Sequence, residues 1–377
     1  MLSTEEINRY NRHILLPEIG MEGQRKLKHS SVLIIGAGGL GCPAMQYLTA
    51  AGIGTIGIVD FDTVDETNLQ RQVLYTIDDI GKPKVECAIH RLSRINPFVN
   101  FIPYNLQLTN KNAISIIKNY DIIIDGSDNF VTRYLVNDAC VLLNKPLVYG
   151  SIYKFEGQVS VFNYSKNDED KGPTYRCLFP NPPAPESSPN CSETGVLGTL
   201  PGIIGTLQAN EAIKICTGMG DVLSGQLSII NALTMQFYSI VFERNQNLFD
   251  TAPSTLEEFI DFDYGLFCSA AKPKNINEIT SDELNDLINK DRNAIQIIDV
   301  RSANEEPTLN TLKEIQIPFG EIVENSGKIN AEKKVIVICK LGIRSAIAIQ
   351  LLEKNSNLTN LYNLKGGVTE WIKKYNP

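Results

Sequence analysis

Short apolar runs alternate with helical segments along the first 150 residues. The runs SVLIIG (31–36) and TIGIVD (55–60) flank a segment of helical composition, 42–51, and this order is typical of a βαβ unit. Further pairs of helical and apolar segments follow, at 84–96, 120–125, 131–144 and 146–150. The pattern therefore predicts an α/β domain with a doubly wound, Rossmann-like and mostly parallel sheet.

The flanking residues predict an N-terminal helix and an antiparallel extension. STEE (3–6) is a capping-box pattern that opens a helix expected to run to about Leu16, before Pro17. GQVSVFNY (157–164) alternates like an antiparallel strand, and a loop with five prolines between residues 180 and 189 comes next. The predicted domain then closes with a Gly/Ala-rich helix and a strand, at 203–216 and 226–231.

Periodicity stops near residue 245 and resumes near residue 276. Residues 246–275 are predicted to be a linker. Its aromatic side chains could pack it against a domain. Beyond it, the strand patterns AIQIIDV and KVIVIC alternate with helical segments, and LYNLKGG precedes a last helix. The sequence thus predicts a first domain at 1–245 and a small α/β domain at 276–377.

Composition narrows the classes of partner and compartment. With 43 acidic and 35 basic residues, the formal net charge is -8, which argues against nucleic-acid binding. The N-terminus has no apolar signal core, and the apolar runs are far shorter than the ~20 residues of a membrane helix. Eight cysteines without a CxxC pair predict a soluble, cytoplasmic protein with reduced thiols.

A glycine loop predicts nucleotide binding. Gly36, Gly38 and Gly41 fit GxGxxG between a strand and a helix, and Asp60 ends the next strand 19 residues after Gly41. The glycines let the backbone approach phosphates, and an acid at this spacing can hold a ribose. By itself the motif leaves NAD(P), FAD and ATP open.

Polar residues after the next strands favour ATP. The sequence NLQRQ (68–72) contains Arg71, GKPK (81–84) contains Lys84, and GSDN (126–129) contains Asp128. Ligands of open α/β sheets bind at the carboxyl ends of the strands, where Asp60 and Asp128 are expected. Two cations and an acid there suit a triphosphate with its metal better than a dinucleotide.

Residues 1–245 resemble the MoeB/ThiF-type adenylyltransferases that activate ubiquitin-like sulfur carriers, a family related to the adenylation domain of ubiquitin-activating enzymes. The resemblance is carried by RYNRHILLPEIGMEGQRKL, GAGGLGCPAMQYLTAAGIGTIGIVDFDTVDETNLQRQ, GKPKVECAIHRLSRINP and GSDNFVTRYLVNDAC. It implies a homodimer in which Arg12 reaches the partner's site, with Arg71 and Lys84 on the phosphates and Asp128 on Mg²⁺. The ATP-binding residues it implies are Gly36, Gly38, Gly39, Asp60, Asn68, Leu69, Gln70, Arg71, Lys84, Asp128 and Asn129.

Most of the cysteines are predicted to have no chemistry. Cys42, Cys87, Cys140 and Cys216 lie in apolar helical segments and are expected to be core residues. Cys177 lies where many relatives carry half of a zinc site, but Thr174 replaces the first cysteine of that half. The second half is missing from VFERNQNLFD, so the sequence argues against structural zinc.

Two cysteines are candidates for catalysis. Cys191 follows the proline loop shortly before a helix, and the resemblance matches it to a loop nucleophile of some members. Cys339 follows the strand KVIVI, and its loop CKLGIRS leads into a helix whose dipole, amides and Arg344 could stabilise a sulfur anion.

The C-terminal segment resembles a rhodanese domain with a six-residue active loop. The resemblance is carried by DVR (299–301), the Cys339 loop, LKGGV (364–368) and Trp371, and it implies that Cys339 carries a persulfide. The segment SANEEPTLNTLKEIQIPF (302–319) replaces the Gly-His-Ile stretch usual after DVR. This departure leaves the specificity for small-molecule sulfur donors open.

Together the two resemblances predict an adenylyltransferase/sulfurtransferase. It would use ATP and Mg²⁺ to adenylate the terminal glycine of a MoaD/ThiS-type carrier ending in Gly-Gly. Cys339, charged by an upstream donor such as a cysteine desulfurase, would then supply sulfur for a thiocarboxylate. Molybdopterin, thiamine and other thiocarboxylate pathways remain open, as do two alternatives: an NAD(P)-dependent oxidoreductase and a non-catalytic carrier-binding scaffold.

Overall fold

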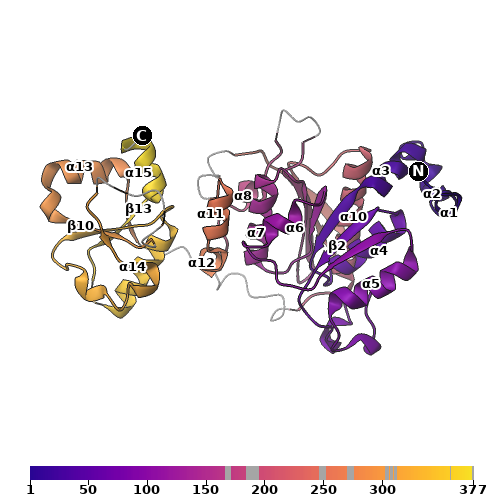
Figure 1. The fold of residues 1–377 in the computed structure, drawn as a ribbon, viewed down its shortest axis with the longest axis horizontal. Helices are drawn as coiled ribbons and strands as arrows, with labels where there is room; N and C mark the ends of the chain where they lie inside the picture. The colour runs from indigo at the N-terminus through magenta and orange to yellow at the C-terminus, as the bar shows by residue number, and fades with distance from the viewer. Residues whose placement is uncertain are drawn as a thin grey trace. The chain divides into compact units, whose positions relative to one another are not determined.

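The computed structural model describes residues 1–165, 171–183, 195–245, 252–269, 276–301, 305, 309, 312–356 and 358–375. Apart from Pro182 and Pro183, the described residues up to Tyr264 form one compact unit, and those from Gly265 onward form a second (Figure 1). We call them the N-terminal and the C-terminal unit.

The N-terminal unit is built on an eight-stranded sheet. Five parallel strands form one half, in the order β3 (Asn100–Tyr104), β2 (Thr55–Val59), β1 (Ser31–Ile35), β4 (Ile122–Asp125) and β5 (Leu147–Tyr153). Three antiparallel strands extend it: β6 (Glu156–Phe162), β7 (Gln226–Asn231) and β8 (Gln236–Val241). The predicted fold class, a mostly parallel sheet with an antiparallel extension, is confirmed.

Helices cover both faces of this sheet. Figure 1 shows α6 and α7 on one face and α4, α5 and α10 on the other. The main core lies on the second face, because the inward side chains of β1 and β2 pack there against Met45, Leu48 and Leu92. The helices of this unit are α1 (Thr4–Arg9), α2 (Asn11–Ile14), α3 (Gly20–His29), α4 (Gly41–Ala51), α5 (Lys84–Ile95), α6 (Ala113–Ile117), α7 (Phe130–Leu142), α8 (Tyr175–Leu178), α10 (Thr199–Thr217) and α11 (Leu256–Asp261).

The prediction of a single N-terminal helix is wrong. The capping box of Ser3 and Glu6 is present, but the helix breaks at Tyr10, so that α1 and α2 are separate before Pro17 is reached. Tyr10 is 4% exposed, and its hydroxyl accepts a hydrogen bond from Asn96 Nδ2 at 2.8 Å. Anchoring of this ring in the core explains the break, which the local sequence pattern does not show.

The pattern also missed the two outer strands. β3 contains Pro103, and β8 is exposed at each of its residues, so neither has the buried apolar pattern that marks β1, β2 and β4. Outer strands pair on one side only and need less burial. Because β3 was missed, the run 146–150, which is the fourth strand in the predicted order, belongs to the fifth strand of the chain, β5.

Part of the predicted linker packs on the N-terminal unit. The helix α11 contacts α7, and its Phe259 is fully buried. The Tyr264 hydroxyl, at the start of α12 (Tyr264–Ser269), donates to Asp138 Oδ2 at 2.9 Å. Asp138 also accepts Arg176 Nε and Nη2 at 2.8 and 2.7 Å, in an ion pair whose two side chains are each 1% exposed.

The C-terminal unit is a smaller, all-parallel α/β domain. Its sheet has the order β11 (Ile315–Gln316), β10 (Ile295–Asp299), β12 (Lys334–Ile338), β13 (Leu361–Leu364) and β9 (Asn277–Ile279). Apolar clusters cover both faces of the sheet, as buried parallel strands require. The unit's helices besides α12 are α13 (Ser281–Asp291), α14 (Ile343–Asn355) and α15 (Gly367–Tyr375).

The buried ion pair of Asp138 predicts a specific stability defect. Asp138→Ala removes the carboxylate that pairs with the buried charge of Arg176. We therefore expect the free energy of unfolding of the N-terminal unit to fall by about 3–5 kcal/mol, as measured by urea titration followed by circular dichroism. Asp282→Ala removes an exposed carboxylate paired with Lys374 and should leave the urea midpoint unchanged. Equal midpoints for Asp138→Ala and the parent would contradict this assignment.

Candidate active sites

A pocket of about 440 Å³ lies at the carboxyl ends of β1, β2 and β4. Its glycine loop follows β1 and leads into α4. Gly36 has a φ of +93°, and a Cβ there would lie 2.7 Å from Gly126 O, so only glycine fits this turn. The predicted site residues that line the pocket are Gly36, Gly38, Gly39, Asp60, Arg71, Lys84, Asp128 and Asn129.

Asp60 connects the end of β2 to the glycine loop. Its carboxylate accepts the amides of Ala37 at 2.7 Å and of Asp62 at 2.8 Å. Burial raises the pKa of Asp60, an effect that Lys84 and the two amide hydrogen bonds partly offset. A carboxylate held in this way is well placed to accept hydrogen bonds from the hydroxyls of a ribose.

Cationic side chains line the same pocket. Lys84 begins α5, is 5% exposed, and donates from Nζ to Asp62 at 2.9 Å. Arg71 donates from Nη1 to Thr67 O at 3.0 Å, which turns its side chain back along its own segment. A polyphosphate entering the pocket would meet both charges.

The end of β4 and the turn after it carry two carboxylates, one buried and one exposed. Asp125 is 1% exposed, accepts the Ser127 amide and hydroxyl, and has a pKa raised by burial. Asp128 is exposed at the rim of the pocket. Asn129 Oδ1 accepts the Thr132 amide at 2.9 Å, so this side chain caps α7.

Several predicted residues do not line this pocket. Asn68 Oδ1 accepts the Asp65 amide at 3.3 Å, Leu69 packs against the core, and Gln70 lines a neighbouring groove. Arg12 is exposed on α2 and is not among the residues that line the pocket. Cys191 lies outside the described residues.

Sequence reasoning missed Arg133, Asp62 and Gln72, which line the pocket. Arg133 is 8% exposed, donates from Nη2 to Ser127 O at 3.3 Å, and has its guanidinium 5.5 Å from the centre of the Tyr149 ring. Its signal in the sequence is its position one turn after the Asn129 cap, which aims it back toward the strand end. Asp62 lies two residues after Asp60, on the same loop.

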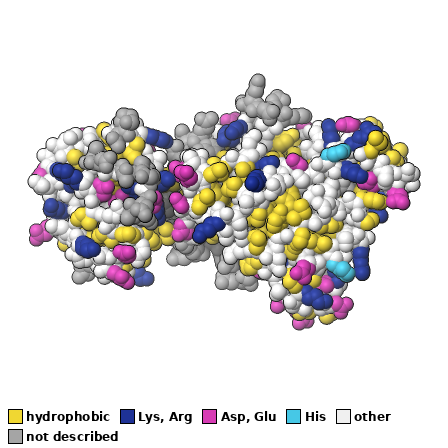
Figure 2. Space-filling model, viewed as in Figure 1, with side chains coloured by type: hydrophobic (Ala, Val, Ile, Leu, Met, Phe, Trp, Pro, Cys, Tyr) yellow, Lys and Arg dark blue, Asp and Glu magenta, His cyan; other side chains and the backbone are white. Residues whose placement is uncertain are grey.

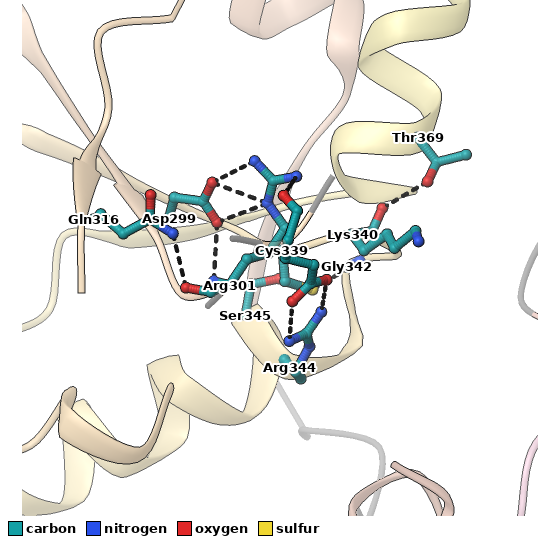
Figure 3. A network of polar contacts seen from close by, with 10 residues as sticks. Asp299, Arg301, Gln316, Cys339, Lys340, Gly342, Arg344, Ser345 and Thr369 are labelled. Atoms are coloured by element: carbon teal, nitrogen blue, oxygen red, sulfur yellow. Dashed lines mark hydrogen bonds and ion pairs between the residues drawn. The ribbon is translucent and has the colours of Figure 1, made fainter. Parts of the chain in front are cut away.

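The second site is centred on Cys339, directly after β12 (Figure 3). The thiol is 1% exposed, and its Sγ accepts the Gly342 amide at 3.1 Å. Ser345 Oγ lies 3.2 Å from Cys339 Sγ and 2.6 Å from Asn363 Oδ1, so its proton can be shared between them. An amide of the loop and a hydroxyl at the start of α14 are thus both directed at the sulfur.

Arg344, in the first turn of α14, forms an ion pair with Glu305. Nη1 donates to Glu305 Oε2 at 2.8 Å, and Nη2 donates to Glu305 Oε1. Nearby, Arg301 is held in a buried ion pair with Asp299, with Nη2 2.6 Å from Oδ2, and Gln316 Nε2 donates to Arg301 O. The DVR element therefore braces the wall of the site (Figure 3).

Gly367 sets how closely α15 approaches the Cys339 loop. Its φ is +61°, and a Cβ would lie 2.3 Å from Cys339 O and 2.7 Å from Gly342 N. The Val368 amide donates to Cys339 O at 2.9 Å, and the Thr369 amide and hydroxyl donate to Lys340 O. The last helix thereby fixes the carbonyls of the loop.

The remaining described cysteines differ from Cys339 in their surroundings. Cys42 and Cys140 are fully buried and Cys87 is 6% exposed, as predicted, whereas Cys216 is half-buried. Burial raises the pKa of Cys42 to about 12 and that of Cys216 to about 11, so both are weak nucleophiles at neutral pH.

Cys177 is the residue at which the sequence argues against a structural zinc site. Its Sγ accepts the Thr174 amide at 3.4 Å and the Asn245 amide at 3.5 Å. Within the described ranges, His, Cys, Asp and Glu side chains nowhere gather in threes around a possible metal position.

The described residues include no helix long and apolar enough to cross a bilayer.

Comparison with known proteins identifies both units. The model of the ThiF family matches residues 10–249, and the rhodanese-like domain model matches 280–374. The chain belongs to the ThiF family. The ThiF domain thus contains the pocket at the ends of β1, β2 and β4, and the rhodanese-like domain contains Cys339.

Relatives match either the whole chain or the ThiF domain alone. The chain is 41% identical to a probable adenylyltransferase/sulfurtransferase MoeZ of Mycobacterium tuberculosis, over 100% of this chain and 95% of that protein. It is 39% identical to the adenylyltransferase and sulfurtransferase MOCS3 of Drosophila grimshawi, over 99% and 85%. The ThiF domain alone is 51% identical to a sulfur carrier protein adenylyltransferase of Thermus thermophilus, over 64% of this chain and 89% of that protein.

Solved structures confirm the fold of the ThiF domain. A structure of Escherichia coli MccB with MccA-N7isoASN superposes with a TM-score of 0.57 at 23% identity, over 64% of this chain and 74% of that one. The complex of MccB with ATP gives 0.55 at 23% identity, over 65% and 73%. At this identity the likeness concerns the fold alone.

Gly367 predicts a defect confined to the rhodanese-like domain. Gly367→Ala forces a side chain against Cys339 O at a positive φ, which costs on the order of 1–3 kcal/mol and displaces the loop. We expect a lower urea midpoint for this domain and less persulfide on Cys339 by mass spectrometry. Gly327→Ala meets nothing within 4 Å and is the matched control. Parent-like persulfide loading in Gly367→Ala would show that the loop does not depend on this contact.

Proposed function

We propose that the chain adenylates the C-terminal glycine of a ubiquitin-like sulfur carrier with ATP and then converts the acyl adenylate to a thiocarboxylate with sulfur carried on Cys339. The observation that carries this proposal is the presence of two built sites in one chain. One is a cationic pocket at the carboxyl ends of parallel strands, and the other is a sulfur-binding loop. The names of the relatives support the pairing of these activities.

The pocket suits the first step. An oxygen of the carrier's terminal carboxylate attacks the α-phosphorus of ATP, the bond from that phosphorus to the bridging oxygen breaks, and pyrophosphate leaves. Arg71, Lys84 and Arg133 line the pocket where negative charge accumulates on the phosphates. Asp60, anchored on the Ala37 amide, orients the ribose.

The residues at the rim also fit Mg²⁺. Magnesium is commonly bound by one or two carboxylates together with phosphate oxygens and water, and Asp128 is an exposed carboxylate at the pocket. Bound there, the ion would neutralise charge on the phosphates. Asp62 holds Lys84 at 2.9 Å and so keeps the ammonium aligned along the pocket before ATP enters.

The rhodanese-like domain suits the second step. The outer sulfur of a Cys339 persulfide attacks the carbonyl carbon of the acyl adenylate, AMP leaves, and an acyl disulfide forms. The Gly342 amide and the Ser345 hydroxyl stabilise negative charge on the sulfur. A second thiol must then cleave the acyl disulfide, and we assign this role to Cys191. Its sulfur attacks Cys339 Sγ, the thiocarboxylate leaves, and a thiol reductant then reopens the Cys191–Cys339 disulfide.

We further propose that the chain acts as a homodimer, with Arg12 in the partner's pocket. A groove of about 750 Å³ lies beside the nucleotide pocket, and its apolar lining residues include Pro43, Val73, Leu197, Ile203 and Leu207. Figure 2 shows hydrophobic side chains gathered on the visible face of the N-terminal unit. Arg71 lines both the groove and the pocket, so a second copy on the groove would reach the phosphates.

Asp128 tests the adenylation step. Asp128→Ala should remove ATP–pyrophosphate exchange with a Gly-Gly carrier while leaving the circular dichroism spectrum unchanged, because the side chain is exposed. Asp78→Ala, also exposed, is the matched control and should keep exchange. Exchange at the parent rate in Asp128→Ala would refute its role. Failure of the parent with every Gly-Gly carrier would favour a scaffold, and magnesium-independent pyridine-nucleotide binding would favour an oxidoreductase.

Cys339 tests the sulfur-transfer step. Cys339→Ala should retain pyrophosphate exchange but form no thiocarboxylate on the carrier, as measured by its mass increase of one sulfur for one oxygen. Cys268→Ala removes a half-buried thiol elsewhere and should retain both activities. Full thiocarboxylate formation by Cys339→Ala would exclude Cys339 as the sulfur carrier.

A further inference from the structure

The guanidinium of Arg344 is bound by a carboxylate of its own domain. Arg344 Nη1 and Nη2 donate to Glu305 Oε2 and Oε1, and the two side chains are 25% and 11% exposed. Two parallel hydrogen bonds form the bidentate geometry in which an arginine–carboxylate pair is strongest. Partial burial reduces competition from water, so the pair is more persistent than an ion pair on the surface.

This ion pair lies within electrostatic range of the sulfur. Burial lowers the pKa of Arg344, whereas the hydrogen bonds that it donates to Glu305 and its electrostatic interactions with Cys339, Glu305 and Asp299 raise it, and the net shift is upward. Glu305 therefore neutralises the cation that the Cys339 loop would otherwise present to a ligand. Figure 3 shows Arg344 in the network around Cys339.

Charge neutralisation affects sulfur donors unequally. Thiosulfate is a dianion, and its leaving group, sulfite, is also a dianion that needs positive charge as it departs. With both terminal nitrogens of Arg344 bound to Glu305, the loop offers less positive charge to bind sulfite, and the carboxylate repels it. A thiol persulfide carries at most one negative charge and releases a thiolate, so Glu305 hinders it less.

We propose that Glu305 is a specificity-determining residue of the sulfurtransferase site, which disfavours oxyanion donors and reserves Cys339 for donors that carry sulfur as a thiol persulfide. The inference rests on the proposed function of Cys339 as a persulfide carrier. Glu305 belongs to SANEEPTLNTLKEIQIPF (302–319), the segment in which the chain departs from the rhodanese pattern. The departure thus supplies the residue that alters the choice of donor.

Each of the two competing reactions forms one S–S bond and breaks one S–S bond. In the disfavoured reaction the Cys339 thiolate attacks the outer sulfur of thiosulfate, a new S–S bond forms, the S–S bond of thiosulfate breaks, and sulfite leaves with the electron pair. In the favoured reaction the thiolate attacks the outer sulfur of a persulfide R–S–SH, the bond between the two donor sulfurs breaks, and R–S⁻ leaves with the electron pair. Neither reaction needs a further oxidant or reductant.

The test uses the full-length chain with two donors, thiosulfate and cysteine persulfide, and measures persulfide formation on Cys339. Glu305→Gln keeps the size of the side chain but removes its charge, so the positive charge of Arg344 is no longer offset and can attract an anionic donor. We expect kcat/KM for thiosulfate to rise about tenfold through a lower KM, equivalent to about 1.4 kcal/mol, and that for cysteine persulfide to change less than about twofold. Glu332→Gln, an exposed carboxylate of the same domain, should change neither value.

Further variants separate the possible outcomes. Glu305→Gln combined with Arg344→Gln should lose the gain with thiosulfate, because the freed cation is then absent. If Glu305→Gln does not fold, Glu305→Asp, which draws the carboxylate back by one methylene, should show a smaller gain. An unchanged or lower thiosulfate kcat/KM in a folded Glu305 variant overturns the proposal. Loss of the proposed function itself is distinct, since the parent chain would then take sulfur from neither donor.

Discussion

The turn between a buried parallel strand and the following helix is the constraint on which both sites depend. In the ThiF domain, β1 ends at Ile35, and Gly36 passes so close to Gly126 that no side chain fits. In the rhodanese-like domain, β12 ends directly before Cys339, and Gly367 lets the start of α15 contact the loop backbone. In each case close backbone packing sets the course of the turn at the strand end, and the side chains of the site are arranged around it. In the rhodanese-like domain the Gly342 amide is thereby directed at Cys339 Sγ.

Charge around each turn is balanced by groups of the chain itself. Lys84 is held by Asp62 in the nucleotide pocket, and Arg344 is held by Glu305 beside the sulfur. The two pairs differ in their exposure: the Asp62 side chain is 51% exposed and open to exchange for phosphate, whereas that of Glu305 is 11% exposed. A partner carboxylate that water reaches can yield to a substrate anion, while a sheltered one is harder to displace and so selects among substrates.

The core elements and the places of the candidate site residues at strand ends could be predicted because they depend on local pattern. The apolar runs of β1, β2, β4, β10 and β12 mark buried strands, and the polar residues that follow them mark strand ends. The outer strand β8 could not be predicted in this way, because all its residues are exposed. Tyr10 interrupts the N-terminal helix through a contact with Asn96, 86 residues away, which no local pattern contains.

The sequence by itself determined two α/β domains, the strand ends that carry Asp60 and Asp128, and the loop that carries Cys339. Only the tertiary structure decided which charges meet: Arg133 in the nucleotide pocket, Asp62 on Lys84, and Glu305 on Arg344, 39 residues away. The physical reason is the range of the interactions. Hydrophobic periodicity and turn chemistry act between residues close in sequence, whereas an ion pair depends on distances in space that folding of the whole domain sets.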